Sequence, residues 1–264
     1  MYDKIDVKAN GGGLKMKLGA QFYSIRDNTT TPEALYEAFK AIKNIGYAAV
    51  QMSAICEIDA KLLKSYSEEF SLPITCTHSP FDRIINDTDN LIQEHLIYGC
   101  PTIGLGYMPN EYHEGNGVYD FIEILREPIR KIKAAGLNFA YHNHAFEFKS
   151  VEGKLMFDIL IDELPELDFI LDTYWVKYAG YDYLEYIKRL GKDRLKNVHF
   201  KDMKTEPNGD ICPCGEGIID FAPVVKLCDE LGIVNALVEQ DNAPDSGDSI
   251  GQMAISYNNL KHLF

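Results

Sequence analysis

Basic residues are scarce in this sequence, which has 26 Lys and Arg against 40 Asp and Glu in 264 residues and a formal net charge of −14. Nucleic-acid binding needs a basic face that neutralises phosphates, so this charge disfavours that class of protein. The sequence also lacks the roughly 18 consecutive apolar residues of a membrane span, and its first fifteen residues lack the apolar core of a secretory signal. We therefore expect a cytoplasmic protein that binds neither nucleic acid nor membrane.

Cysteine motifs are missing as well. Six Cys are present without a CxxC pair, so we expect reduced, mostly buried thiols; the one close pair, Cys212 and Cys214, has no second pair to complete a zinc knuckle. No GxGxxG motif follows the first apolar run, where a dinucleotide-binding fold would have one. Apolar residues make up 46% of the chain and charged residues 25%, which excludes a disordered or collagen-like protein.

A repeated pattern begins at Lys17: a short apolar run, then turn residues, then a stretch with helical periodicity. It recurs eight times. The predicted strands are residues 18–23, 48–52, 74–77, 102–105, 137–142, 167–172, 195–200 and 236–239, and the predicted helices are 32–45, 59–70, 86–98, 118–135, 155–163, 183–190, 221–231 and 249–262.

Eight strand–helix units in about 250 residues, with no linker rich in Pro, Gly or Ser, predict an α/β fold: a single-domain (β/α)8 TIM barrel. We expect this catalytic domain to span residues 16–264. An open doubly wound α/β sheet is the less favoured alternative. Residues 1–15 are polar and end close to Gly11-Gly12-Gly13, so we expect a loose N-terminal leader there.

Polar residues follow the predicted strands, among them Gln51 after the second and Asp241 after the eighth. In a parallel barrel the active site lies at these carboxyl ends. Glu147, Asp172, His199 and Glu239 come from four successive units and would converge on one quadrant of the mouth. Any one of them alone would more often be a salt-bridged or solvated loop residue, but their joint placement favours a site for Mn²⁺, Mg²⁺ or Co²⁺, with Zn²⁺ or Fe²⁺ as alternatives.

The first ligand has two candidates. In His142-Asn143-His144 the two histidines lie on one face of the strand. If that face is the barrel interior, His142 can replace or supplement Glu147 as a ligand; otherwise it binds substrate or orients a ligand. The wider set of predicted substrate contacts is His78, His142, His144, Trp175, Lys201 and Glu216.

Five segments carry a resemblance to a known family: AYHNHAFEF at 140–148, LDTYW at 171–175, VHFKD at 198–202, GEG at 215–217 and VEQD at 238–241. Together with the opening GAQFYSIRD at 19–27, the chain resembles the xylose isomerase-like TIM-barrel superfamily over residues 17–264. That group contains sugar phosphate isomerase/epimerases, ketose 3-epimerases, hydroxypyruvate isomerase, inosose dehydratase, 3-keto-glycoside-processing enzymes and endonuclease IV.

The resemblance implies one divalent metal ion held by Glu147, Asp172, His199 and Glu239. Asp172, His199 and Glu239 match the family's motifs directly. Relatives with a Leu-Glu-Pro-type fifth strand carry the ligand Glu where this chain has His142, so Glu147 matches only by its later place in the motif. Trp175 stands where ketose 3-epimerases carry a substrate-contacting His, and its indole offers a face on which a sugar can stack.

The function that the resemblance implies is a metal-dependent sugar isomerase/epimerase, with Mn²⁺ as the first choice of ion. It would act on a ketose or keto-sugar through a metal-stabilised enediolate, with Glu147 and Glu239 as acid and base. A dehydratase or 3-keto-glycoside lyase on the same site, and a non-catalytic sugar-binding barrel, are the alternatives. The family also makes a homo-oligomer a possibility.

Two further absences narrow the substrate. The Asp-x-x-His motif that endonuclease IV carries after strand six is Asp172-Thr-Tyr-Trp175 here, which disfavours DNA repair. No phosphate-binding glycine loop follows strands seven and eight, which favours an unphosphorylated sugar.

Overall fold

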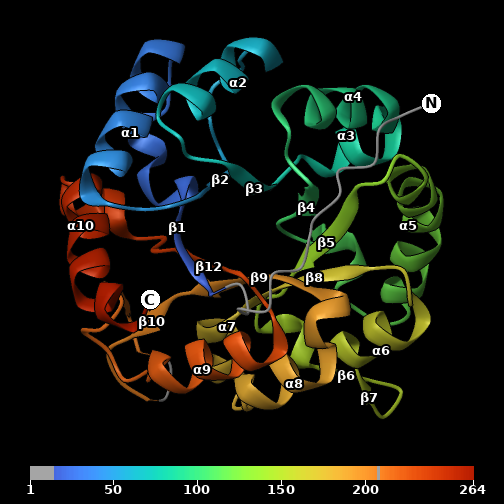
Figure 1. Cartoon of the computed structure of the whole chain (residues 1–264). Coiled ribbons are helices and arrows are strands. Elements are labelled where there is room, and N and C mark those ends of the chain that lie inside the picture. Colours follow the sequence, from blue (N-terminus) through green and yellow to red (C-terminus); the bar gives the residue numbers. More distant parts are fainter. Residues whose placement is uncertain (1–14, 207–208) are drawn as a thin grey trace.

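A ring of parallel strands surrounded by helices forms the centre of the molecule (Figure 1). This computed structural model describes residues 15–206 and 209–264, so almost all of the predicted leader lies outside the described residues. The strands of the ring are β1 (Lys17–Gln21), β2 (Val50–Met52), β3 (Ile74–Thr77), β4 (Thr102–Leu105), β5 (Asn138–His142), β8 (Asp168–Asp172), β9 (Leu195–Phe200) and β12 (Asn235–Val238).

The order of these strands is that of a barrel. Hydrogen-bonded neighbours run β3-β2-β1-β12-β9-β8-β5-β4, so β1 joins the first and last units of the chain. The ring closes between β3 and β4, where the amide of Ser79 donates to the carbonyl oxygen of Gly104 at 2.8 Å. The predicted TIM barrel is therefore confirmed, and the open-sheet alternative is wrong.

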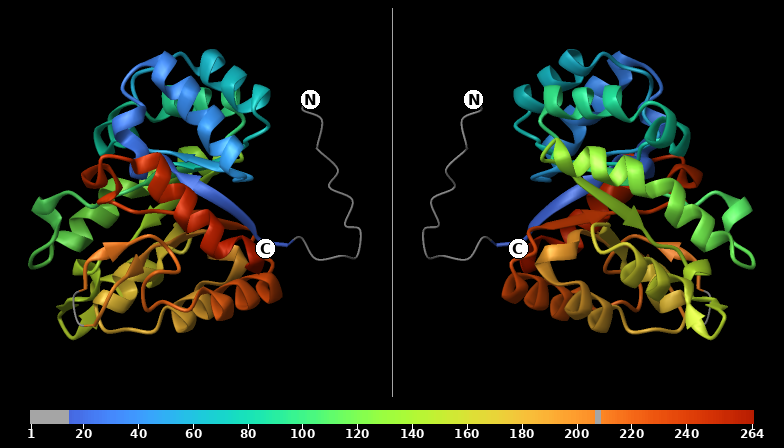
Figure 2. Two further views of the ribbon diagram at one scale, coloured as in Figure 1. Left: turned by 90° about the vertical axis from the view of Figure 1, so that its left-hand side faces the viewer. Right: turned by 90° about the vertical axis from the view of Figure 1, so that its right-hand side faces the viewer.

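Helices cover the outside of the ring. They are α1 (Pro32–Ile45), α2 (Ala60–Glu69), α3 (Phe81–Asn86), α4 (Thr88–Tyr98), α5 (Gly117–Ala134), α6 (Met156–Glu163), α7 (Thr173–Tyr178), α8 (Tyr183–Arg194), α9 (Phe221–Leu231) and α10 (Ser249–Leu260). The side views show the C-terminus beside the start of β1, at the end of the barrel opposite the carboxyl ends of the strands (Figure 2). Within the described residues, no helix combines the length and the apolar character that a membrane crossing requires.

Clear local signals gave accurate boundaries. Helix α1 has the predicted bounds because Thr31 Oγ1 accepts from the amide of Ala34, Pro32 occupies the first turn, and Gly46 ends the helix with φ of +120°. Helix α9 and strands β3, β4 and β9 also match their predicted bounds.

The short elements at strand ends were missed. The first strand stops at Gln21 rather than residue 23, because the Gln21 side chain accepts from the amide of Tyr23 and starts the 3-10 helix η1 (Phe22–Asn28). The six-residue helices α3 and α7 follow β3 and β8, and the helix expected from residue 86 begins at Thr88. Helices of fewer than two turns are too short for hydrophobic periodicity to reveal them.

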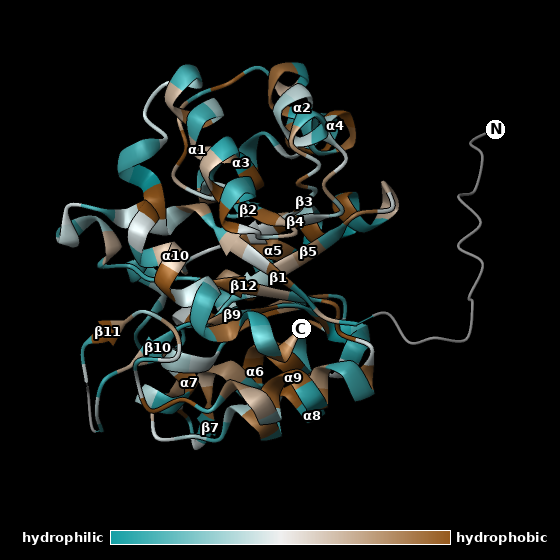
Figure 3. Ribbon diagram, turned by 60° about the vertical axis from the view of Figure 1, so that its left-hand side comes forward, coloured by the Kyte–Doolittle hydropathy of each residue, from teal (hydrophilic) through white to brown (hydrophobic). Residues whose placement is uncertain are grey.

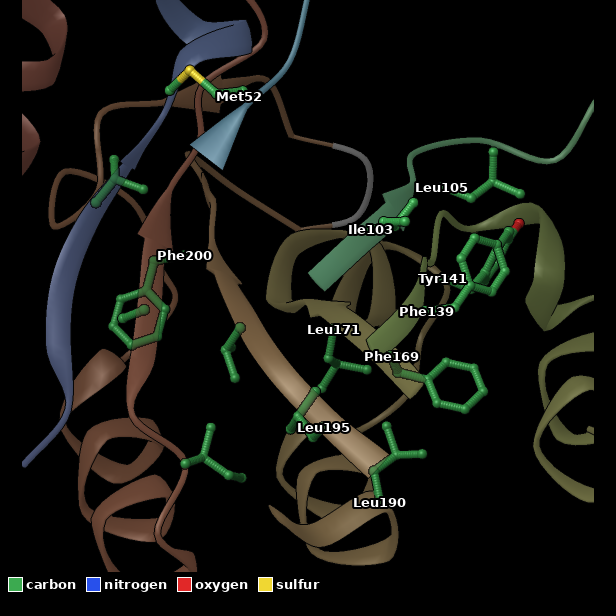
Figure 4. Packing of buried hydrophobic residues seen from close by; sticks show 14 of the residues in the cluster. Met52, Ile103, Leu105, Phe139, Tyr141, Phe169, Leu171, Leu190, Leu195 and Phe200 are labelled. Carbon is green, nitrogen blue, oxygen red and sulfur yellow. The ribbon is translucent and has the colours of Figure 1, made fainter. Parts of the chain in front are cut away.

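The core has two layers. The larger one lies between strands and helices and includes Phe139, Phe169 and Phe200 (Figure 4). A small separate cluster consists of Cys76, Ala140 and Ile170, from β3, β5 and β8. The helices are hydrophobic toward the strands and hydrophilic on the opposite side (Figure 3). All six cysteines are free and five are buried, as predicted.

Closure at β3 and β4 requires glycine at position 104. A Cβ there would overlap the carbonyl oxygen of Thr77 and lie 3.0 Å from Cys76 Sγ. We expect Gly104→Ala to lower the free energy of unfolding by about 3 kcal/mol, the upper end of the range for overpacking, because backbone must move. Chemical denaturation measures this value. Gly99→Ala is the comparison, since its Cβ meets nothing within 4 Å and only the positive φ of 72° is strained. An equal loss in both variants would contradict the steric argument.

Candidate metal centre and cavity

Four adjacent strands bring four ionisable side chains together at the carboxyl end of the barrel. His142 ends β5, Asp172 ends β8, His199 lies in β9, and Glu239 follows β12; these strands are neighbours in the order β5-β8-β9-β12. Their candidate ligand atoms all lie within 4.8 Å of one another, and all four residues are buried. We call His142, Asp172, His199 and Glu239 the four-residue group. It could hold a metal ion.

His142, not Glu147, completes this group. Nε2 of His142 lies 3.4 Å from Asp172 Oδ2 and 3.7 Å from Glu239 Oε2. Glu147 is bound elsewhere: its Oε1 accepts from the Tyr141 hydroxyl at 2.5 Å and its Oε2 from the amide of His144 at 2.8 Å. Of the two candidates for first ligand, the position of His142 therefore supports that role and the position of Glu147 does not.

Glu147 has this environment because the chain turns sharply after β5. The residue lies in the 3-10 helix η3 (Phe146–Phe148), which aims its side chain back at Tyr141 of β5. The carboxyl group is fully buried, and burial raises its pKa to about 7, although the hydrogen bonds from Tyr141 and His144 oppose the rise. Through its hydrogen bond with the amide of His144, Glu147 fixes the backbone of a residue that lines the cavity.

Each imidazole ring of the group makes a hydrogen bond through the nitrogen that points away from the carboxylates. Nδ1 of His142 donates to the carbonyl oxygen of Gly106 at 3.3 Å, and Nε2 of His199 lies 2.7 Å from Gln51 Oε1. The opposite ring nitrogens, Nε2 of His142 and Nδ1 of His199, face the carboxylates. One nitrogen toward the group and the other in a hydrogen bond is the arrangement of metal-binding histidines, so the rings fit a metal ion.

The carboxylate of Asp172 is oriented in the same way. Its Oδ1 accepts from the amide of Trp175 at 3.1 Å and so starts helix α7, and its own amide donates to Asn143 Oδ1 at 2.9 Å. Oδ2 is left facing the two histidines. The donor set toward the centre of the group is thus two nitrogens and two carboxylate oxygens.

Lys201 places a positive charge beside the group. Its Nζ lies 3.4 Å from Asp172 Oδ2, 3.3 Å from Glu239 Oε2 and 2.8 Å from Asp241 Oδ1. Burial alone would lower the pKa of Lys201, but these three carboxylates raise it above its ordinary value, so the ammonium stays charged.

The remaining charges suit a divalent ion. Burial raises the pKa of Asp172 to about 6, whereas Lys201 and His199 hold the pKa of Glu239 well below its ordinary value against the effect of burial. Burial and His199 lower the pKa of His142, which keeps that ring neutral with a free lone pair. Three carboxylates against one ammonium leave two negative charges.

A cavity of about 430 Å³ opens beside the four-residue group, within the size range of small-molecule sites. The lining includes the aromatic side chains of Phe81 and Tyr107. The full lining is Tyr23, Ser53, His78, Ser79, Pro80, Phe81, Leu105, Gly106, Tyr107, His142, His144, Lys201, Glu239 and Asp241. A cavity that contains both candidate ligands and aromatic rings can bind a polyhydroxylated molecule, with its C–H faces against the rings.

The predicted substrate contacts divide into two sets. His78, His142, His144 and Lys201 line the cavity. Trp175 packs behind it, with its ring 5.3 Å from that of His144 and 5.2 Å from Lys201 Nζ. Glu216 is exposed on a loop and is not part of the lining.

Sequence reasoning assigned no role to three residues of this region. Gln51 and Asp241 were visible at strand ends, but no local pattern pairs Gln51 with His199 or Asp241 with Lys201, since those partners are distant in sequence. Phe81 lies in α3, which was not predicted. The only feature of the sequence that could have pointed to Phe81 was its position between a predicted strand and the next predicted helix.

The barrel and its four-residue group define a class: a TIM barrel with a candidate metal centre at the carboxyl ends of its strands. Residues 39–252 match the model of one family, described as xylose isomerase-like TIM barrel. The chain belongs to this family.

Solved structures with the same fold include several enzymes. A sugar phosphate isomerase/epimerase from Parabacteroides distasonis shares 20% identity, with 97% of this chain and 96% of that chain covered and a TM-score of 0.75. A D-allulose 3-epimerase from Methylomonas sp. shares 14% (95% and 98% covered, TM-score 0.68). A probable 3-DHS dehydratase from Bacillus anthracis shares 13% (91% and 98% covered, TM-score 0.64). No curated protein matches the chain significantly.

Proposed function

We propose that this chain is a divalent-metal-dependent sugar isomerase/epimerase that acts on a ketose or keto-sugar. The observation that carries the proposal is the buried group of His142, Asp172, His199 and Glu239 beside a cavity of about 430 Å³. Membership of the xylose isomerase-like family supports it, as does the presence of a sugar phosphate isomerase/epimerase and a D-allulose 3-epimerase among proteins of the same fold.

The proposed cofactor is one divalent ion, with Mn²⁺ as the first choice. Two imidazole nitrogens and two carboxylate oxygens also suit Co²⁺, Zn²⁺ and Fe²⁺, and suit Mg²⁺ less well because of the second imidazole. When bound, the ion would polarise a substrate carbonyl and stabilise the negative charge that develops on its oxygen.

Glu239 is the proposed base. It belongs to the four-residue group and also lines the cavity, so its carboxylate can take a proton from the carbon next to a bound carbonyl. Lys201, beside it, can donate a hydrogen bond to a substrate oxygen. His78 and His144 also line the cavity, and burial lowers the pKa of both, so these neutral rings can donate a hydrogen bond to a substrate oxygen. Return of the proton from Glu239 to the neighbouring carbon gives an isomer, and uptake of a solvent proton on the other face gives an epimer.

Glu147 is not given the acid–base role that the sequence predicted, because its two carboxylate oxygens are bound by Tyr141 and His144. The carboxylates lining the cavity are then Glu239 and Asp241, which both follow β12. Carboxylate bases on one side of a bound sugar are sufficient to remove a proton next to the carbonyl, after which a substituent on the β-carbon can leave. This observation favours a dehydratase or 3-keto-glycoside lyase as the second candidate function.

The charges of the cavity favour an unphosphorylated sugar. Lys201 is the one Lys or Arg in its lining among the described residues, and three carboxylates already surround its ammonium. Arg26 stacks on the ring of Tyr23 and donates to the backbone oxygens of Tyr23 and Asp241. A phosphate group entering the cavity would therefore meet excess negative charge.

The test is proton–deuterium exchange in D₂O. Metal-free protein is reconstituted with Mn²⁺ and incubated with free ketoses, 3-keto-sugars and inososes, and with their phosphorylated counterparts. We expect metal-dependent loss of one C–H signal in an uncharged compound, with slower exchange in its phosphorylated form. Product analysis then separates epimer, isomer and elimination product. If no compound exchanges and no metal ion binds, the proposal fails and a non-catalytic sugar-binding barrel takes its place.

A further inference from the structure

We infer that Gln51 is a positioning residue that determines which nitrogen of His199 faces the metal centre. The inference rests on the proposed metal-dependent function. Gln51 lies in β2 and is fully buried, and its Oε1 is 2.7 Å from Nε2 of His199. It is not part of the cavity lining, so it acts on a substrate only through the histidine.

The hydrogen bond selects one form of the ring. An amide oxygen only accepts, so Nε2 of His199 carries a hydrogen, and Nδ1 is the nitrogen left to release its hydrogen and bind a metal ion. Nδ1 is the nitrogen that lies 2.8 Å from Glu239 Oε2 and 4.0 Å from Asp172 Oδ2. In this structure Nδ1 donates its hydrogen to Glu239. Because Gln51 keeps the hydrogen on Nε2, Nδ1 is the nitrogen that can release its hydrogen when a metal ion binds.

The pairing of β2 with β3 is irregular next to Gln51. The pairing of β2 with β3 shifts register between Val50 and Gln51, so that Val50 lies opposite Ile74 but Gln51 opposite Cys76. The extra residue, Thr75, lies in β3, and irregularities of this kind are common next to active sites. Gln51 projects into the barrel behind His199, where side chains of the inner layer meet.

A second observation distinguishes Gln51 from a residue that only fills space. Its Nε2 is buried without a hydrogen-bond partner among the described residues. An unpaired buried donor destabilises the fold, which an apolar side chain of similar size would avoid. The Gln51 amide thus destabilises the fold through its unpaired Nε2, while its Oε1 holds His199, a candidate metal ligand. Being uncharged, it also leaves the two excess negative charges of the centre unchanged.

The barrel provides a matched control in Gln21. It is the register partner of Gln51 on β1 and is equally buried, but its Oε1 accepts from the amide of Tyr23 and its Nε2 lies 3.4 Å from Nδ1 of His78. Gln21→Leu therefore removes an inner-layer amide of the same kind without touching the four-residue group.

The experiment compares Gln51→Leu, Gln51→Glu and Gln21→Leu with the wild type. Calorimetry gives the Mn²⁺ affinity of each metal-free protein, the visible spectrum with Co²⁺ reports the coordination sphere, and ¹⁵N NMR shows which nitrogen of His199 is protonated. We expect Gln51→Leu to lose affinity by about 10- to 100-fold, the range for residues that orient metal ligands, with an altered Co²⁺ spectrum and a mixture of ring forms. Gln51→Glu, which keeps the acceptor, should retain the wild-type ring form, and Gln21→Leu should bind the ion as the wild type does.

The inference is overturned if folded Gln51→Leu binds Mn²⁺ like the wild type, or if Gln21→Leu loses as much affinity. If Gln51→Leu does not fold, the ring form of His199 in the metal-free wild type and in Gln51→Glu decides: an Nε2 without hydrogen contradicts the inference. Failure of the proposed function looks different, because the wild type itself would then bind no metal ion.

Discussion

Glu239→Gln is expected to slow substrate proton exchange by about three orders of magnitude or more. The amide has the size of the carboxylate but cannot take a proton, and general acid–base catalysis alone contributes about 10²- to 10⁴-fold. The change also removes a candidate ligand, since Glu239 Oε2 lies 2.8 Å from His199 Nδ1 and 3.3 Å from Lys201 Nζ. Exchange in D₂O with saturating Mn²⁺ measures the first effect, and calorimetry measures the second.

Asp241→Asn is the matched control for that substitution. Asp241 lies on the same side of the cavity and its Oδ1 is 2.8 Å from Lys201 Nζ, but it is not a member of the four-residue group. We expect a smaller loss of exchange and nearly unchanged metal affinity. If Glu239→Gln retains more than a tenth of the wild-type exchange rate, Glu239 is not the base.

The second large effect is expected from His142→Gln, which should weaken Mn²⁺ binding by more than about 100-fold, beyond the range for residues that merely orient ligands. Nε2 of His142 faces Asp172 and Glu239, so its removal takes one of four donors from the centre. Calorimetric titration of the metal-free variant measures the loss, and circular dichroism shows whether the variant is folded.

Glu147→Gln serves as its control and tests the alternative first ligand. We expect it to bind Mn²⁺ nearly as well as the wild type; a loss equal to that of His142→Gln would restore Glu147 as a ligand. Its effect should be on pH dependence instead. Burial raises the pKa of Glu147 from 4.5 to about 7, so the folded state favours the protonated form. That stabilisation is complete below pH 4.5 and is lost as the pH rises through about 7, a change of about 3 kcal/mol that the variant should lack.

Much of this arrangement could be predicted from the sequence because a barrel follows simple rules. Alternation of strand and helix patterns gave the eight units, and the rule that active sites lie at the carboxyl ends of strands selected Asp172, His199 and Glu239. All three lie in the four-residue group. Their convergence could be predicted because a residue's position in or just after a regular strand decides its direction.

The rest depended on features without a periodic signal. Whether His142 or Glu147 joins the group is decided by the turn through η3, a single turn of helix that carries no hydrophobic periodicity. The pairing of Lys201 with Asp241 and of Gln51 with His199 depends on which strands become neighbours after closure. Such contacts are consequences of the closed fold and leave no mark in the local sequence.

The position of Lys201 bears on when the protein would acquire the proposed ion. An internal ammonium among Asp172, Glu239 and Asp241 relieves the repulsion that would otherwise oppose bringing these carboxylates together. Unlike a zinc finger, whose chain stays unfolded until metal arrives, a barrel with this internal counter-charge can complete its folding first. If the proposed ion binds, its identity is then selected by a folded site, and the ion recovered with the protein would follow the supply in the host cell during expression as much as the preference of the site.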